Sequence, residues 1–520
     1  MKSNEKKYTM SLASVMWLVL MTTILVIVAF CHFPRGADWH WLLPLDGFYH
    51  IPMMLAGVAV VVLLALLCFK FCKSNELNRR RLLITSIIIT ILQTVLVYSY
   101  YVHTDWDVQQ IIGTAKAMAQ GDSVEDFRWY FQWAPNNLLL TRLFAAVFFV
   151  TGPLWGFKAT LFPLLALQSA GACLTALMLT QTAMHIWHRK DCAILTYLFY
   201  TLLVWMSPWW SIPYSDIWGL MLAVTLLWLS TTLPFKCRWL KIFIVFATTA
   251  FSYYIRPQTV FVTLSVVLVK LLETLRNRKG LKSLLKPSGL ALAGVMAGFL
   301  VVNAAMIGSP LHLQSSKALG VSHYLMLGAN YQSIGIYSAQ DVDFSRSFPK
   351  KKERRQAEMK EMRKRYHDLE LSGTLLLWGR KNLLNFSDGT FYWGREGDFF
   401  KEVPDRSGPV AKATRSLFHK REGSGKNYVA WSVATTTLWF GLLVISLFAA
   451  LPRKRHQEAL DDNGRRIIDI VIFALLMLIA FHTLCEARAR YLFCFTPLFV
   501  LAAVEGARRL LGGLLQDKRR

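Results

Sequence analysis

Charged residues are scarce in this sequence. They make up 17% of its 520 residues, whereas 54% are hydrophobic. This balance excludes an ordinary soluble protein. The sequence contains runs of about 18 or more residues with almost no charged residue, and each can cross the roughly 30 Å hydrocarbon core of a bilayer as a helix. The sequence therefore predicts an all-α polytopic membrane protein.

Motifs for metals and soluble cofactors are missing. The eight cysteines form no CxxC pair and no zinc-like cluster with histidine, so neither a structural metal nor a disulfide framework is indicated. The chain has no Walker A loop, no dinucleotide glycine fingerprint and no Ser/His/Asp arrangement above chance. No cofactor is therefore expected, and a divalent metal is permitted but not indicated.

Acidic residues are few as well. The chain has 32 Asp and Glu against 58 Lys and Arg, for a net charge of +26. In a soluble protein this excess would favour a nucleic-acid partner. Here most basic residues lie in short loops between apolar runs, where cytoplasmic loops collect Lys and Arg. We therefore expect no nucleic acid, and membrane lipid is the surrounding partner.

About twelve transmembrane helices are predicted from the apolar runs. The first run follows several lysines but is too long for the core of a signal peptide, so we expect it to be retained as a span. The predicted spans cover residues 10–31, 51–72, 82–101, 161–187, 192–208, 214–233, 239–254, 256–272, 288–306, 428–451, 467–484 and 490–510.

The basic loops set the expected orientation. They all fall inside the cell if both termini are cytoplasmic and the chain crosses only once between residues 104 and 187. A thirteenth apolar stretch, residues 138–152, is therefore predicted to lie along the outer surface of the plasma membrane or to dip into it. The loops concerned are residues 188–190, 236–241, 276–286, 453–455 and 518–520.

This topology divides the chain into four parts. The third part contains a charged run, residues 350–365, which predicts a solvated helix, and an aromatic segment with turn residues at 386–400. The parts are an N-terminal two-span extension (1–81), a transmembrane core (82–307) with outer loop 103–153, a mixed extracytoplasmic insert (308–427) and a C-terminal three-span segment with a basic cytoplasmic tail (428–520).

Two acidic residues, Asp105 and Asp107, come directly after the third predicted span. Acidic residues are costly at a membrane boundary, and a carboxylate fixed there suits general-base chemistry on a lipid-borne substrate. An amphipathic run follows at residues 111–118, so these aspartates equally suit an N-cap of a surface helix. One of the two can serve each purpose.

The order of short motifs resembles the GT-C superfamily of membrane glycosyltransferases, and most closely the GT-C-like proteins of Gram-positive cell envelopes. The family places an acidic residue just past an outward span, two membrane-parallel helices in the first outer loop, and a large outer segment before the last spans. The matching motifs here are Asp105-Trp106, Ala115, Ala119 and Gly121, then Tyr130-Phe131, Pro135-Asn136-Asn137, and Glu486-Ala487-Arg488-Ala489-Arg490-Tyr491.

The resemblance implies an inverting transfer of a sugar from a polyprenyl-phosphate donor to an envelope glycan or another surface acceptor, on the extracytoplasmic side. Asp105 is then the base that deprotonates the acceptor hydroxyl, and Asp107 positions the base or the acceptor. Expected to bind substrate are Asn136, Asn137, Tyr214, Asp216 and Glu486, with Tyr214-Ser215-Asp216 similar to an outer turn of mannosyltransferase-like members.

Three arginines, Arg256, Arg488 and Arg490, lie near outer turns under this topology. Guanidinium groups bind phosphate oxygens bidentately, so these arginines, together with Tyr491, are predicted to hold the donor phosphate. The alternative is structural: they reach lipid headgroups or pair with Glu486 and Asp216. The positive-inside rule disfavours three arginines in short outer loops without a reason.

Other functions share parts of this pattern. A polysaccharide polymerase or ligase acting on diphosphate-linked substrates would use similar arginines. A lipid or glycan transporter calls for charges at mid-membrane depth, which the predicted spans nearly lack. A non-catalytic assembly subunit would keep the fold without the chemistry. The charged run at 350–365 is explained either by a solvated or membrane-facing helix or by binding to an anionic polymer.

Overall fold

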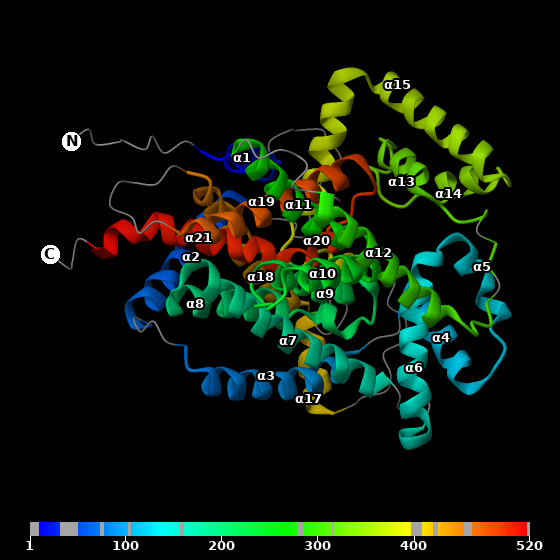
Figure 1. The fold of residues 1–520 in the computed structure, drawn as a ribbon, viewed down its shortest axis with the longest axis horizontal. Coiled ribbons are helices and arrows are strands. Elements are labelled where there is room, and N and C mark those ends of the chain that lie inside the picture. Colours follow the sequence, from blue (N-terminus) through cyan, green and yellow to red (C-terminus); the bar gives the residue numbers. More distant parts are fainter. Residues whose placement is uncertain are drawn as a thin grey trace.

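A computed structural model describes residues 10–31, 50–72, 77–101, 104, 106–156, 161–277, 285–311, 313–314, 316–396, 408–419, 425–451 and 460–516. Within these residues the secondary structure is helical and contains no strand (Figure 1). The predicted all-α class is therefore confirmed for this part of the chain. The insert, which was predicted to be mixed, consists of helices joined by turns and irregular segments and contains no strand among its described residues.

The helices of the described residues follow one another in chain order, with short 3-10 segments between some of them. Their bounds are α1 Leu12–Phe30, α2 His50–Phe71, α3 Arg79–Tyr100, α4 Asp107–Gln120, α5 Glu125–Trp133, α6 Leu138–Trp155, α7 Leu161–Trp187, α8 Lys190–Tyr200, α9 Ser215–Thr231, α10 Arg238–Tyr253, α11 Val260–Arg276, α12 Leu285–Met306, α13 Val321–Gly328, α14 Ala339–Arg346, α15 Lys351–Phe386, α16 Trp393–Glu396, α17 Pro409–Phe418, α18 Lys426–Ser446, α19 Asp462–Leu484, α20 Arg490–Phe493 and α21 Thr496–Gln516.

Nine helices of the described residues are long and apolar enough to cross a membrane. Eight of them coincide with predicted spans: α1, α2, α3, α7, α11, α12, α18 and α19. The other four predicted spans are helical but shorter or more charged. The run at 192–208 is α8 followed by a π-helix, Thr201–Trp205, and α21 carries Glu505, Arg508 and Arg509.

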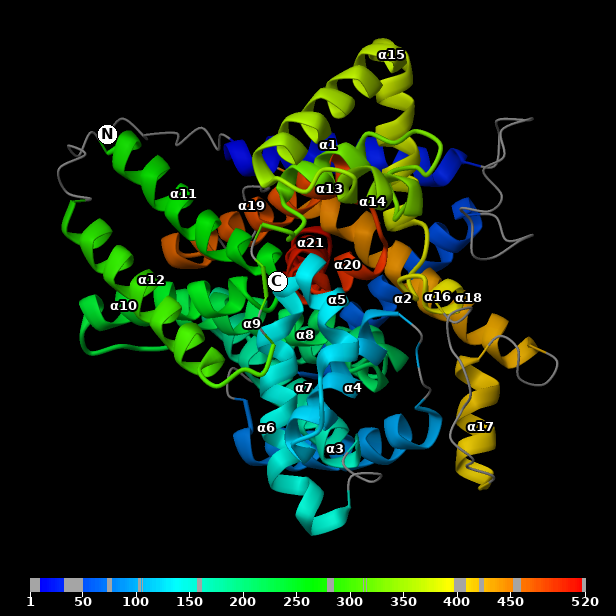
Figure 2. The ribbon, with the colours of Figure 1, turned by 90° about the vertical axis from the view of Figure 1, so that its right-hand side faces the viewer.

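The ninth candidate is the helix over the stretch that was predicted to lie along the outer surface. Together with the preceding 3-10 turn it spans Pro135–Trp155, which is long enough to cross. Figures 1 and 2 show α6 running across the direction of α7 and α21 rather than alongside them. This crossed direction agrees with a helix that lies along the membrane when α7 and α21 pass through it.

Close helix crossings depend on glycine. Gly57 of α2 faces Gly441 of α18, and a Cβ on either would overlap the backbone of the partner helix. Since α2 lies within the predicted N-terminal extension, this crossing ties the extension to the C-terminal segment. The extension is thus packed into the body of the molecule rather than attached beside it.

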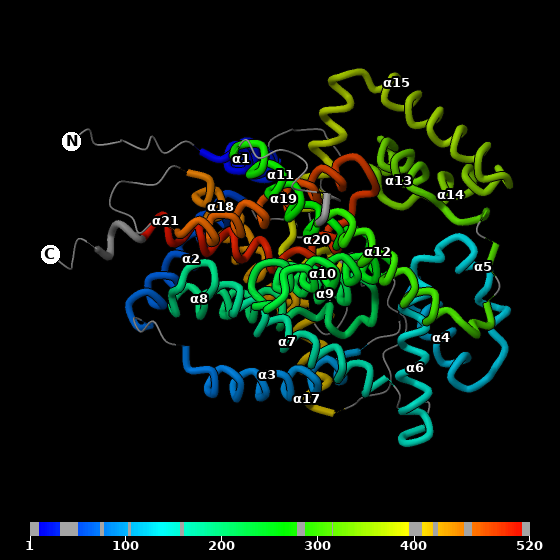
Figure 3. The backbone as a smooth tube through the Cα atoms, in the orientation of Figure 1, coloured from blue at the N-terminus to red at the C-terminus, as the bar shows by residue number. Residues whose placement is uncertain are grey.

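The predicted insert carries a long bent helix, α15. Its backbone leaves the helical conformation at Glu370, where φ is 55°, and Figure 3 shows that α15 is bent. The aromatic segment after it forms a turn in which Phe391 and Trp393 are buried. Trp393 packs edge to face on Trp209, with ring centroids 5.2 Å apart. These aromatics are part of the core, where they stabilise the fold rather than offer a surface for sugars.

Candidate functional site

Asp107 opens α4 and meets the start of α9. Its Oδ2 accepts a hydrogen bond of 2.6 Å from the Tyr214 hydroxyl. The residue before it, Trp106, is the N-cap and makes no side-chain capping bond. The Asp107 carboxylate is therefore engaged by a phenol from another helix, and the capping interpretation does not hold for it. Asp105, the predicted base, lies outside the described residues.

Asp216, in the first turn of α9, lies between two arginines. Its Oδ1 is 2.7 Å from Arg256 Nη2, and its Oδ2 is 3.7 Å from Arg490 Nε. All three side chains are buried. Asp216 therefore shares its single carboxylate between two guanidinium groups in a region of low dielectric, where charges interact strongly.

Gly219 makes room for this arrangement one turn further along α9. A Cβ at this position would lie 2.8 Å from Arg256 Cγ and 3.1 Å from Cys494 Sγ. The thiol of Cys494 in turn donates to the carbonyl oxygen of Asp216 at 3.0 Å. A side chain at 219 would push Arg256 away from its carboxylate, so the missing Cβ positions the guanidinium.

Aromatic rings surround the two guanidinium groups. The guanidinium carbon of Arg490 is 4.1 Å from the ring centroid of Trp106 and 5.3 Å from that of Tyr214. The guanidinium carbon of Arg256 is 4.4 Å from the centroid of Tyr491. Such cation–π contacts hold arginines in fixed orientations without neutralising them. We call Asp107, Tyr214, Asp216, Arg256, Arg490 and Tyr491 the acid–arginine cluster.

The phenols of this region stay protonated. Burial and the neighbouring Asp107 carboxylate raise the pKa of Tyr214 well above its usual value. The same two causes raise the pKa of Tyr130 on α5, whose hydroxyl also reaches Asp107. Both groups therefore act as donors to the carboxylate, which they stabilise in its charged form.

The loop from Cys485 to Ala489 brings Glu486 and Arg488 to the edge of the cluster. Burial raises the pKa of the Glu486 carboxyl, while Arg488, Arg490 and a hydrogen bond with Tyr491 oppose the rise. The loop is anchored by Ala487, whose amide donates to the carbonyl of Gly335 at 2.9 Å. Glu486 therefore lies among arginines, as the structural alternative expected.

The two predicted asparagines differ in position. Asn137 is buried and its amide donates to the Tyr130 hydroxyl, which connects it with Asp107. Asn136 is exposed and contacts only Asn137, through a 3.3 Å bond from its amide nitrogen, among the contacts that the structure describes for its side chain. The structure thus brings Asn137 to the cluster and leaves Asn136 at the surface.

Four residues near the cluster were given no role by the sequence. Tyr130 lies in a quoted motif, but its contact with Asp107 depends on how α5 folds back. Tyr324 of α13 lies near Glu486 and Tyr491, which raise its pKa together with burial. His482 Nδ1 lies 3.1 Å from the carbonyl oxygen of Glu486. The fourth residue is Lys381. No sequence spacing signals such contacts between distant segments.

Lys381 is fully buried in α15, beneath the Glu486 loop. Its ammonium group donates to the carbonyl of Cys485 at 2.6 Å and to that of Gly328 at 2.9 Å. Burial lowers the pKa of Lys381 to about 7, against smaller opposing effects of Cys485 and Glu486. Lys381 therefore joins α13 to the loop that carries Glu486, Arg488 and Arg490.

We expect the melting temperature of the purified protein to rise between about pH 6 and pH 8.5, in part because of Lys381. An unfolded lysine keeps its proton up to about pH 10. Above pH 7 the unfolded state therefore binds more protons than the folded one, and stability rises with pH. Differential scanning fluorimetry in detergent at fixed ionic strength measures this.

Lys381→Met tests the assignment. In this variant the melting temperature should rise less with pH, because the contribution of Lys381 is gone. The variant should also be destabilised by about 1–3 kcal/mol, because two buried carbonyls lose their donor. Glu486 has a raised pKa and contributes with the opposite sign, so the comparison with the variant isolates Lys381. An unchanged pH profile in the variant would contradict the assignment.

Comparison with known proteins identifies a family. A family model described as "Conserved hypothetical integral membrane protein" matches residues 50–508. No curated protein and no solved structure matches the chain. The matched range starts at α2 and contains every residue of the acid–arginine cluster. Its description names a membrane location and no activity.

Proposed function

We propose a transfer reaction for this chain, which belongs to the family of conserved hypothetical integral membrane proteins. It moves a sugar from a polyprenyl-phosphate donor to an extracytoplasmic acceptor, as the likeness to GT-C glycosyltransferases implies. The observation that carries the proposal is the acid–arginine cluster itself. Its carboxylates and guanidinium groups come from four separate segments and meet at helix ends.

The chemistry requires a base and a phosphate site close together. The acceptor hydroxyl attacks the anomeric carbon of the sugar while Asp105 takes the hydroxyl proton. The bond between that carbon and the phosphate oxygen breaks, and its electron pair leaves with the polyprenyl phosphate. Asp107, fixed by Tyr214 and Tyr130, positions the acceptor side.

The arginines receive the leaving group. A phosphodiester donor carries one negative charge, and Arg256 and Arg490, which share the single carboxylate of Asp216, are the groups proposed to bind it. When the sugar leaves, the phosphate gains negative charge, and fixed guanidinium groups stabilise that gain. This charge stabilisation supports a role for the arginines beyond pairing with Asp216. The pairing itself is what the structural alternative predicted.

The proposal is tested by transfer from a panel of radiolabelled polyprenyl-phosphate sugars into envelope acceptors. Purified wild type and Asp105→Asn are compared in liposomes. Transfer by the wild type alone supports the reaction and the base together. No transfer by either protein, together with no binding of any lipid donor, would contradict the proposal and favour a transporter or an assembly subunit.

The proposed sidedness has its own test in Cys237. This cysteine is exposed in the turn before α10, which the basic loops place in the cytoplasm. A membrane-impermeant maleimide should label it in inverted vesicles and not in intact cells. As a control, Asp122→Cys in a Cys237→Ser background should be labelled from outside, because Asp122 is exposed after α4. Labelling of Cys237 in intact cells would reverse the topology.

A further inference from the structure

The first half of α15 separates its charges between two faces. Its outward face is basic, and Lys350 just before it is paired with Glu353 at 3.0 Å. All the residues of this outward face are exposed. We call it the basic face, and it consists of Lys351, Lys352, Arg355, Lys360, Arg363 and Lys364.

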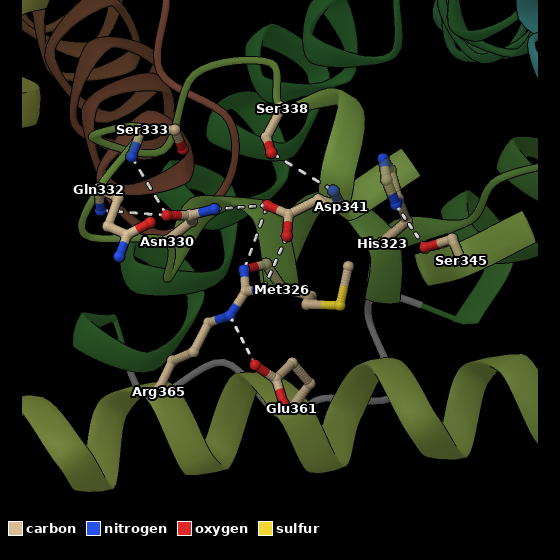
Figure 4. A network of polar contacts seen from close by, with 10 residues as sticks. All are labelled: His323, Met326, Asn330, Gln332, Ser333, Ser338, Asp341, Ser345, Glu361 and Arg365. Carbon is tan, nitrogen blue, oxygen red and sulfur yellow. Dashed lines mark hydrogen bonds and ion pairs between the residues drawn. The ribbon is translucent and has the colours of Figure 1, made fainter. Parts of the chain in front are cut away.

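The other acidic residues of this segment, Glu358 and Glu361, form hydrogen bonds or ion pairs on the inward face. Glu358 is buried and accepts a hydrogen bond from the Ser322 hydroxyl. Figure 4 shows Arg365 held by Glu361, at 3.0 Å, and by Asp341, at 2.6 Å. Arg354 is buried and donates to the carbonyl of Ala318 at 3.0 Å. These contacts dock α15 on α13 and α14 and orient the basic face outward.

This separation leaves a positively charged surface on a helix that is packed against α13 and α14. The residues from Lys351 to Lys364 extend about 20 Å along the helix axis. Six positive charges lie along that length on the exposed part of the helix, where Glu353 is the only exposed acidic residue, and they form an extended basic surface. A linear anion with repeated charges can contact several of them at once.

The membrane surface matches it less well. Helices that lie on a bilayer insert an apolar face next to the basic one. Among the described residues no large exposed apolar side chain lies between Tyr337 and Leu371, and the face opposite the basic one is packed on α13 and α14. The basic face therefore contacts solvent, which favours a soluble polymer.

We propose that the basic face binds a linear, phosphate-bearing polymer, which is the acceptor of the transfer reaction. The role as acceptor rests on the proposed function, whereas the binding does not. Figure 1 shows the first half of α15 at the same end of the molecule as α4 and α5. A polymer held there lies at the same end of the molecule as α4, the helix that begins at Asp107.

Binding is tested with the full chain in nanodiscs of zwitterionic lipid, with short-chain inorganic polyphosphate as the probe. The wild type should bind, and its affinity should fall steeply as salt rises, because counterions are released. A variant with Lys352→Gln, Arg355→Gln, Lys360→Gln and Arg363→Gln should bind at least about tenfold more weakly and show a smaller salt slope. All four side chains are exposed, so the fold is expected to persist.

A matched variant controls for net charge. It carries Lys70→Gln, Lys236→Gln, Arg238→Gln and Arg276→Gln, which remove four exposed charges elsewhere, and it should bind like the wild type. Equal losses in both variants, or no binding by the wild type, would overturn the proposal. Capture of anionic vesicles without binding of polyphosphate would overturn it too, in favour of a membrane surface.

Transfer assays separate this inference from the proposed function. The basic-face variant should raise the acceptor KM for a phosphate-bearing polymer and leave the donor KM unchanged. Polyphosphate binding without any transfer activity would confirm the surface and contradict the reaction. Transfer that is insensitive to the variant, with a phosphate-bearing acceptor, would overturn the role of the basic face and leave the reaction standing.

Discussion

Asp105→Asn should lower the rate of sugar transfer by about 10²- to 10⁴-fold, the usual loss for a missing general base. The amide keeps the shape of the carboxylate but cannot accept the proton of the acceptor hydroxyl. Asp105 is only two residues from Asp107, so the chain keeps their Cα atoms within about 7 Å of each other. Asp107 itself contacts Tyr214 in the cluster.

Two further variants make the result specific. Asp107→Asn should cause a smaller loss, because the Tyr214 hydroxyl can still donate to the amide oxygen. Asp122→Asn changes an exposed carboxylate in the same outer loop and should leave transfer unchanged. Initial rates at saturating donor, corrected for the amount of folded protein, decide the order. Full activity of Asp105→Asn would remove it as the base.

The membrane class and the grouping of the site follow from properties that a sequence displays directly. Hydropathy locates long apolar helices, and eight of the twelve predicted spans meet the length and hydropathy of a crossing helix. The alternation of spans places every second turn on one side. This parity is why Asp107, Asp216 and Arg490 were expected on the same outer side, although they are far apart in the chain.

Partner choice within the site could not be predicted in this way. Whether Asp216 pairs with Arg256, Arg490 or both depends on the rotation of α9 about its axis and on the space at Gly219. Pairing of charges inside the fold could not be predicted either. In α21, Glu505 is buried between Arg508 and Arg509, at 2.9 and 2.7 Å, so a charged helix still packs in the core.

Arg490→Met should lower transfer by about 10²- to 10³-fold, a loss typical of removing one fixed donor to a developing negative charge. It should leave the melting temperature nearly unchanged. Asp216 keeps its 2.7 Å partner Arg256 in this variant, so no buried charge is left alone. Methionine also fills the space among the rings of Trp106 and Tyr214.

The split between activity and stability separates the two roles of the arginine. Suppose that Arg490 only neutralises Asp216. The double variant Arg490→Met, Asp216→Asn then leaves Arg256 without a carboxylate partner, so its melting temperature falls. Its transfer rate is no lower than that of Arg490→Met alone. If Arg490 holds the leaving phosphate, the single variant already loses transfer, and its donor dependence weakens with it. Arg238→Met, an exposed arginine at the start of α10, is the matched control and should retain full transfer. Unchanged kinetics in Arg490→Met would make this arginine a structural anchor, because a guanidinium 4.1 Å from the Trp106 ring and 3.7 Å from Asp216 would then be fully accounted for by its own neighbours.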